Sequence, residues 1–273
     1  MEEHRIEPVS RFSFGGRELW QYRELFVFFT WRDIKVRYKQ ATLGILWAMI
    51  QPLSMMLLFT LIFGRGLKLT SDGLPYSVFA LSGLLIWNFF SNSLQNAASS
   101  MVSNANIIRK IYFPRLIIPL SAILTALFDM FFALIIFIGL IIYYQLSINP
   151  LKLILLPLSI LLAATTSFGI GTFLAALNVK YRDFQYALPF LIQFLMFVNP
   201  VVYSTKVFAD YPIVQKILEL NPIAGAINMV RSLLNNNPID VYLIGIQFII
   251  AFIFLFIGIY FFRKTEAYFA DLA

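Results

Sequence analysis

Few residues in this sequence could carry out catalysis. The chain has no cysteine and a single histidine, His4, which stands in a polar N-terminal segment. A zinc site or a catalytic triad needs more His or Cys side chains than this. The loops contain no paired carboxylates or nucleophile motif, and the phosphate-binding sequence G-x-x-x-x-G-K-[ST] is absent. We therefore expect no catalytic residue, no metal and no cofactor in this chain.

Positive side chains gather where they could attract an anionic ligand. Arg32, Lys35, Arg37 and Lys39 stand close together before the first apolar stretch. Clustered cations beside a membrane raise the local concentration of phosphate groups. These four residues either attract the head group of a lipid-linked substrate or only anchor a helix to lipid head groups.

Asp129 is the only acidic or basic side chain within the long apolar stretches. A proton or sodium pathway generally uses several such groups, so one carboxylate is weak support for ion coupling. Asp129 either pairs with a Ser, Thr or Tyr of a neighbouring helix or faces a polar conduit.

The elements that position these residues are membrane helices. Hydrophobic residues make up 60% of the 273 residues, charged residues only 13%, and the mean hydropathy is +0.78. Each helix needs roughly 20 apolar residues to cross a bilayer. Six stretches meet this requirement: 43–63, 74–100, 116–145, 153–178, 184–203 and 241–262. The sequence predicts an all-α integral membrane protein with six transmembrane helices over 41–265, between polar cytoplasmic tails at 1–16 and 266–273.

The distribution of Lys and Arg predicts the orientation. Six spans place fifteen of the 21 Lys and Arg on the side that holds both termini. Because cytoplasmic loops carry the excess of positive charge, we expect both termini and the loops after the second and fourth spans in the cytoplasm. Topology then accounts for the net charge of +7, and no nucleic-acid partner is needed.

Three further segments are too polar or too short to span. Within 17–40, Leu19, Tyr22, Phe26 and Phe29 recur at steps of three and four, which predicts an amphipathic helix at the cytoplasmic surface of the membrane. Between spans two and three, Asn104 or Asn106 could cap a short helix that Pro114 stops. That loop is either a docking element for a partner or an ordinary positively charged loop.

Between the last two spans, 213–220 and 224–234 are each long enough for a helix but not for a span. They predict a re-entrant or surface helical pair on the outer side. The pair could gate an exit or form a passive cap.

Several short motifs, taken in order, resemble a known family. Residues 32–40 read RDIKVRYKQ, followed by LG at 43–44 and QP at 51–52. Then come FPR at 113–115 with Pro119, YRD at 181–183, NPVVY at 199–203, and NP at 221–222 with Arg231. Over roughly 19–264 the chain is similar to the membrane subunits of bacterial ABC exporters of O-antigen polysaccharide and teichoic acid.

The resemblance implies a permease in the cytoplasmic (inner) membrane. It would form a homodimer, bind two copies of an ATPase subunit that holds ATP and Mg, and export a polymer carried on undecaprenyl diphosphate. It would be a transport subunit and not an enzyme.

The resemblance also assigns roles to residues of this chain. The coupling helix and a second cytoplasmic contact would meet the ATPase through Ile108, Arg109, Lys110, Tyr112, Arg115, Arg182 and Asp183. The outer gate would contain Asn199, Pro200, Tyr203, Asn221, Pro222 and Arg231.

Three alternatives remain at this point. One is a teichoic acid exporter, which the motifs do not separate from an O-antigen exporter. Another is an ABC permease for drugs or small lipids, which shares the six-span plan. A third is a membrane enzyme acting on lipid carriers, for which Asp33 and Asp183 would be the available acidic residues.

Overall fold

The computed structural model describes residues 16–39, 43–181, 183–235 and 240–266, and the regular elements in these ranges are all helices. The long helices are α3 (Leu46–Phe59, continued by a π-helix at Thr60–Gly66), α4 (Tyr76–Ser103), α6 (Ile117–Tyr143), α7 (Leu155–Lys180) and α11 (Val241–Glu266). The shorter helices are α1 (Gly16–Gln21), α2 (Arg23–Lys39), α5 (Ala105–Ile108), α8 (Phe184–Val198), α9 (Pro212–Leu220) and α10 (Pro222–Ser232), with 3-10 turns at Pro150–Lys152 and Thr205–Phe208. The predicted all-α class is confirmed for these ranges.

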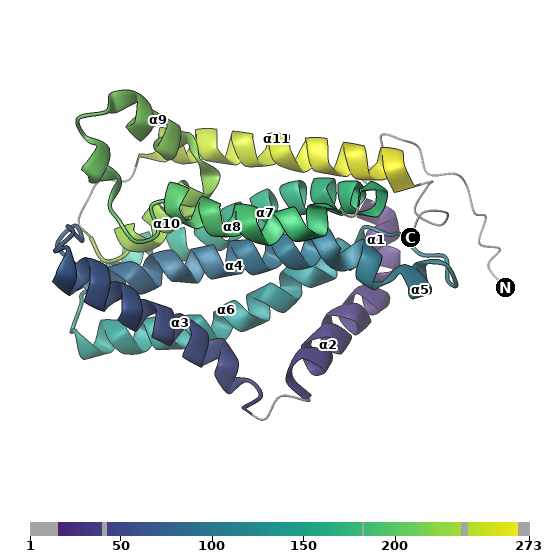
Figure 1. The fold of residues 1–273 in the computed structure, drawn as a ribbon, viewed down its shortest axis with the longest axis horizontal. Coiled ribbons are helices and arrows are strands. Elements are labelled where there is room, and N and C mark those ends of the chain that lie inside the picture. Colours follow the sequence, from purple (N-terminus) through teal and green to yellow (C-terminus); the bar gives the residue numbers. More distant parts are fainter. Residues whose placement is uncertain (1–15, 40–42, 182, 236–239, 267–273) are drawn as a thin grey trace.

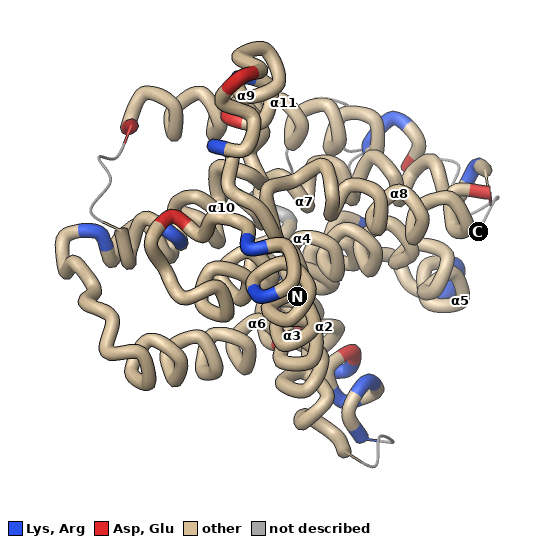
Figure 2. Tube along the Cα trace, turned by 60° about the vertical axis from the view of Figure 1, so that its left-hand side comes forward, with Lys and Arg blue, Asp and Glu red and all other residues tan. Residues whose placement is uncertain are grey.

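The long helices lie side by side along the longest axis of the molecule (Figure 1). One end carries α1, α5 and the C-terminal end of α11, and the other carries α9 and α10. Lys, Arg, Asp and Glu gather toward the ends, while the long helices are almost entirely uncharged between them (Figure 2). This distribution suits a bundle whose middle lies in lipid. The end with α5 is called the inner end below, and the opposite one the outer end.

Within the described ranges, five helices are long and apolar enough to cross a membrane, so the predicted count of six full-length spans is not confirmed. The fifth predicted span, 184–203, is helical only as far as Val198. Its 15 residues give roughly 22 Å, short of the roughly 30 Å of a bilayer core. The helix stops because Asn199 precedes Pro200 and adopts an extended backbone, the conformation that a following proline favours.

The chain nevertheless reaches the outer end after α8. Lys206, beyond α8, forms an ion pair of 2.8 Å with Asp72, which lies in the loop between α3 and α4. The other predicted spans agree with the helices to within a few residues at each end.

Helix α4 forms the centre of the fold. In its most apolar window 83% of the residues are buried, against 17–39% for the other four spans. Helices α6, α7 and α10 pack around it. The first core cluster therefore gathers around α4, with Leu84, Ile86 and Phe89 among its buried side chains. Because α4 also carries Asn and Ser residues, polar groups lie in the interior of the molecule.

Glycines allow α7 and α11 to touch. A Cβ atom on Gly258 would lie 1.9 Å from the carbonyl oxygen of Gly169, and one on Gly169 would lie 2.5 Å from the backbone of α11. Small residues permit this close approach of helices in membranes, where packing rather than hydrophobic burial drives association. The contact fixes the last span against the bundle.

The N-terminal helical segment differs from the prediction in the partner of its apolar face. It is two helices, α1 and α2, interrupted at Tyr22. Phe29 is buried in a second core cluster at the inner end, which also contains Phe113 and Phe262. Leu19 and Phe26 pack against this cluster, so the face meets protein instead of lipid. The exposed apolar residues of the segment include Trp20 and Trp31. The spacing of apolar residues in the sequence predicts the apolar face of this segment, but it cannot show whether protein or lipid covers that face.

Candidate functional site

Arg231 is the centre of a buried cluster at the outer end. It belongs to α10, its guanidinium lies 3.6 Å from the ring centroid of Phe79, and its Nη2 donates a 2.7 Å hydrogen bond to the carbonyl of Val201. Burial lowers the pKa of Arg231 to about 9, and the Asp72 carboxylate acts in the opposite direction. Arg231 therefore still carries its charge at neutral pH and joins α4, α10 and the segment after α8.

The other residues predicted for the outer gate lie in the same region. Asn221 caps α10 by accepting a 2.9 Å hydrogen bond from the amide of Ile223, and its Nδ2 donates to Oδ1 of Asn199 at 3.0 Å. Pro222 is the first residue of α10, a position where the missing amide hydrogen costs nothing. Pro200 is buried beside Asn199. The two Asn-Pro pairs are therefore directly linked.

Tyr203 closes the turn that follows α8. Its hydroxyl lies 3.1 and 2.9 Å from the carbonyl oxygens of Phe197 and Val198, and its single hydrogen is shared between these two acceptors at the end of the short helix. Burial raises its pKa. The structure thus brings all six predicted outer residues together through hydrogen bonds and packing, while their role as a gate stays a prediction.

Sequence reasoning missed further members of this cluster. Asp72 accepts a hydrogen bond of 2.8 Å from the Ser204 hydroxyl in addition to pairing with Lys206. Tyr76 donates a 2.6 Å bond to the carbonyl of Val202. Gly83 lets the segment approach α4, because a Cβ there would lie 2.4 Å from the Val201 carbonyl. None of these residues stands in a recognisable motif, so only the tertiary contacts reveal them.

The inner end carries the loop predicted to couple to a partner. Its helix, α5, is only four residues long and ends at Ile108, well before Pro114. Asn104 does stand at the N-cap position, but its side chain makes no cap bond: its Nδ2 donates to the carbonyl of Ser100 and its Oδ1 accepts from Arg32. The predicted helix up to Pro114 is therefore wrong in length.

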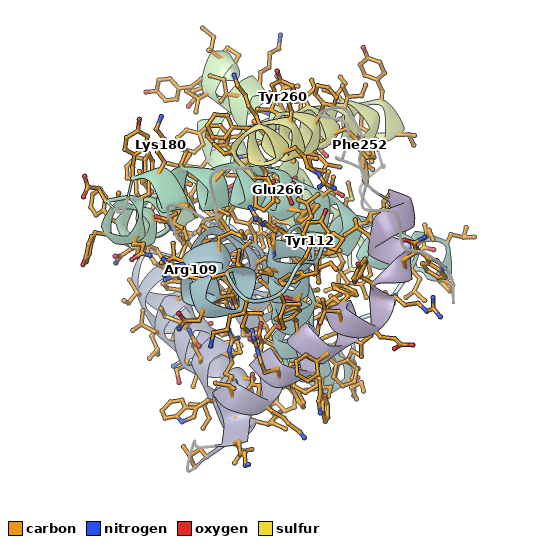
Figure 3. All side chains as sticks on the ribbon, turned by 90° about the vertical axis from the view of Figure 1, so that its right-hand side faces the viewer. Arg109, Tyr112, Lys180, Phe252, Tyr260 and Glu266 are labelled. Carbon is orange, nitrogen blue, oxygen red and sulfur yellow. The ribbon has the colours of Figure 1, made fainter. Side chains whose placement is uncertain are left out.

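One predicted contact residue points inward. Ile108 is buried in the second core cluster, so its assignment to a docking surface is wrong. Ile111 and Tyr112, by contrast, are 61% and 64% exposed. Arg109 and Lys110 are exposed beside them, and Figure 3 looks onto the end where Arg109 and Tyr112 lie.

The remaining predicted inner residues are distributed differently. Arg115 is half-buried and donates from Nη1 to the backbone carbonyl of Glu266 at the end of α11. Asp183 is exposed at the N-cap of α8 without a side-chain cap bond. Arg182 lies outside the described residues. The contacts of Arg115 thus fix the last span to the loop.

The four cations of α2 do not form one uniform patch. Arg32 pairs with Asp33 at 2.7 Å and lies 4.8 Å from the ring centroid of Phe29. Lys35 lies 5.3 Å from the ring centroid of Trp31, and Lys39 is exposed. Arg37 forms an ion pair with Asp129 of α6.

Asp129 pairs with a tyrosine, which is one of the two interpretations left open by the sequence, while a polar conduit at this residue stays a prediction. It accepts hydrogen bonds from the Arg37 guanidinium and the Tyr38 hydroxyl, and it also lines a polar cavity. Burial, and next the bond to Asp129, raise the pKa of Tyr38, so this hydroxyl keeps its proton and remains a donor. The charge of Arg37 could have been expected as the partner, since a lone carboxylate in a span needs a cation.

Two cavities flank α4. The first, about 380 Å³, lies between α2, α3, α4 and α6 and is lined by Arg37, Tyr38, Gln51, Asn88, Asn92 and Asp129 among others. The second, about 540 Å³, lies toward the inner end and is lined by Arg32, Arg37, Asn96, Ser99, Ser103 and Asn104 among others. Arg37 lines both, so polar space continues along one side of α4.

The long apolar helices define this chain as a multi-pass α-helical membrane protein. It belongs to the ABC-2 type transporter family, whose pattern matches residues 24–235.

Named relatives cover most of the chain. An O-antigen export system permease protein RfbA of Klebsiella pneumoniae is 28% identical over 249 residues, which are 91% of this chain and 95% of the relative. A protein of the same name from Myxococcus xanthus is 30% identical over 77% of this chain and 79% of its own length. The polysialic acid transport protein KpsM of Escherichia coli is 27% identical over 63% and 67%.

Proposed function

We propose that this chain is the transmembrane permease subunit of an ATP-driven exporter that moves polysaccharide across the bacterial cytoplasmic membrane. The observation that carries the proposal is the similarity to a permease named for O-antigen export over 95% of that relative's length. Likeness over nearly the whole relative indicates the same transport unit and not one shared segment. Relatives named for two different polysaccharides support polymer export as the common feature.

The energy for export comes from a separate ATPase subunit, present in two copies, that binds ATP and Mg. This chain has no phosphate loop of its own. The exposed side chains of Arg109, Lys110, Ile111 and Tyr112 form the docking surface for that subunit, with Asp183 as a second contact. ATP can drive export only if the ATPase binds two states of the permease with different affinity.

A second copy of the permease completes the transport path. Helix α8 is too short to span alone and exposes large apolar side chains, with Phe190 71% and Phe194 60% exposed. A helix shorter than the hydrocarbon core needs to be accommodated in the bilayer, and oligomerisation is one way of doing so. A homodimer with α8 covered by the second copy meets this requirement.

The polymer travels on an undecaprenyl-diphosphate carrier, as in O-antigen export. The cations of α2 stand where they can attract its diphosphate, and the cluster around Arg231 gates the outer end. Both termini then lie in the cytoplasm, in agreement with the excess of Lys and Arg on that side.

Deletion of this chain from its host, followed by analysis of the polysaccharide by compartment, tests the proposal. We expect lipid-linked polymer to accumulate on the cytoplasmic side and surface polymer to disappear, with recovery when the wild-type chain is supplied. Unchanged surface polymer would rule out polysaccharide export and favour transport of a small molecule.

A further inference from the structure

Polar side chains form a line along one face of α4. Asn88, Asn92 and Asn96 follow one another at four-residue intervals, and Ser99 and Ser103 continue the line toward the inner end. Residues four apart share one face of a helix. The line joins the two cavities, since the first two asparagines border the smaller one and the remaining residues border the larger one.

Three carboxamides in the smaller cavity are available to a ligand. Among the described residues, the side chains of Gln51, Asn88 and Asn92 make no hydrogen bond to protein. Asn178 shows the usual alternative, because its buried amide donates a 3.0 Å bond to the carbonyl of Ala98. Amides that line a cavity in the membrane-spanning part of a protein mark a polar ligand or its path.

The same cavity holds a cation with an exchangeable partner. The side chain of Arg37 is 35% exposed, while that of Asp129 is 16% exposed. A guanidinium binds carboxylate and phosphate with the same fork of donors, so a phosphate can take the place of the carboxylate. Tyr38 already donates to the position that the carboxylate occupies. Arg32, which lines the adjoining cavity, adds a second cation within the same polar space.

The cavity also opens toward the surroundings of the bundle. Trp47 and Gln51, which line it from α3, are exposed, so an amphiphile can reach the cavity from the surface of this chain. A volume of about 380 Å³ lies within the range of small-molecule sites, roughly 300–1,000 Å³. Polar donors at an apolar surface suit a charged head group attached to a hydrocarbon tail.

We propose that this cavity binds the phosphate of a phosphorylated lipid head group, which displaces Asp129 from Arg37 while Tyr38, Asn88 and Asn92 donate to its oxygens. The inference rests on the proposed export of a lipid-linked polymer. It assigns head-group binding to Arg37 instead of to all four cations of α2. Asp129 competes with the ligand and so allows release.

Equilibrium binding of radiolabelled farnesyl diphosphate tests this site. The full chain, together with any subunits that co-purify, is placed in nanodiscs of neutral phosphatidylcholine. We expect Arg37→Gln to bind about tenfold more weakly, because a hydrogen bond to a charged group is worth at least one decade of affinity. Asp129→Asn should bind at least about threefold more tightly, because the competing carboxylate is gone. Arg23→Gln, an exposed position of α2 that lines neither cavity, is the matched control and should bind as the wild type does.

A second variant tests the site without breaking the ion pair. Asn92→Asp adds a negative charge to the cavity and should weaken binding. Wild-type binding by Arg37→Gln would overturn the proposal. Weaker binding by folded Asp129→Asn would overturn it too, because the carboxylate would then position Arg37 for the ligand instead of competing with it. Competition by inorganic diphosphate as strong as by the lipid would indicate a site for free phosphate, and competition by farnesol would exclude phosphate recognition.

Together with the deletion experiment, these measurements test the proposed phosphate site separately from the proposed export of polysaccharide. Deletion of the chain could abolish surface polymer while Arg37→Gln and Asp129→Asn bind the probe as the wild type does. In that case the proposed export function is supported and the proposed binding site is wrong. If the variants change binding as expected but deletion leaves surface polymer intact, a phospholipid site exists and polysaccharide export is wrong.

Discussion

Arg231 at the outer end and Arg109 at the inner end lie in opposite surroundings. At the outer end Arg231 is buried, lies against Phe79 and bonds to the Val201 carbonyl. At the inner end Arg109 and Tyr112 are exposed. A buried and bonded cation fixes one conformation, whereas exposed side chains are free to meet a partner. From this difference we expect the cluster around Arg231 to affect mainly stability, and the surface around Arg109 and Tyr112 to affect mainly the proposed coupling to an ATPase.

Replacing Arg231 should have the largest effect on stability. Arg231→Ala removes the cation–π contact and the charged hydrogen bond, and we expect a loss of about 3 kcal/mol, partly offset by the relieved desolvation of the guanidinium. Thermal unfolding of the purified protein measures it. Lys216→Ala, at an exposed position of α9, is the control. An unchanged melting temperature for Arg231→Ala would contradict the structural role of the cluster.

Gly83 should tolerate no side chain. The Cβ of Gly83→Ala would lie 2.4 Å from the Val201 carbonyl, so the segment after α8 must move, at a cost of about 1–3 kcal/mol. Gly139→Ala on α6 is the matched control, since a Cβ there meets nothing within 4 Å. It should be neutral or stabilising by up to about 1 kcal/mol, because alanine favours the helix. Equal melting temperatures for the two variants would show that the close contact does not matter.

The ion pair between Asp72 and Lys206 should contribute less. The Lys206 side chain is 65% exposed, so solvent weakens the pair, and Asp72→Asn should cost about 0.5 kcal/mol. Chemical denaturation at low and high salt measures it, and the difference from wild type should shrink at high salt. A loss as large as that of Arg231→Ala would make Asp72 a second anchor of the outer end.

Changes on the inner surface should leave stability almost unaltered. Arg109→Ala combined with Tyr112→Ala alters exposed side chains, so we expect a change within about 0.5 kcal/mol. Co-purification with the ATPase subunit should be lost nonetheless. Ile108→Ala is the informative comparison, because its buried side chain should cost stability instead. Normal co-purification of the double variant would exclude this surface as the docking site.

The sequence predicts the long helices well because lipid imposes a minimum length and an apolar composition on each one. It predicts α8 less well, because hydropathy continues through Val201 and Val202 although Asn199 and Pro200 end the helix. A local backbone preference overrides composition there.

The site was predictable where short motifs mark turns. The Asn-Pro pairs and Arg231 were found, and they lie together. Ile108 was assigned to the docking surface by resemblance, and one helical turn has too few residues for the sequence pattern to show which face is buried. The contacts of Asp72 and Gly83 join segments far apart in the chain, and one sequence carries no signal for such pairs.

The most direct test of the account measures surface polysaccharide and membrane abundance together in a deletion strain supplied with single variants. The Arg109 and Tyr112 double variant should insert at wild-type abundance and export no polymer, while Arg231→Ala should lose abundance and export in parallel. Normal export by the double variant, or wild-type abundance and export with Arg231→Ala, would contradict the division of roles between the two ends.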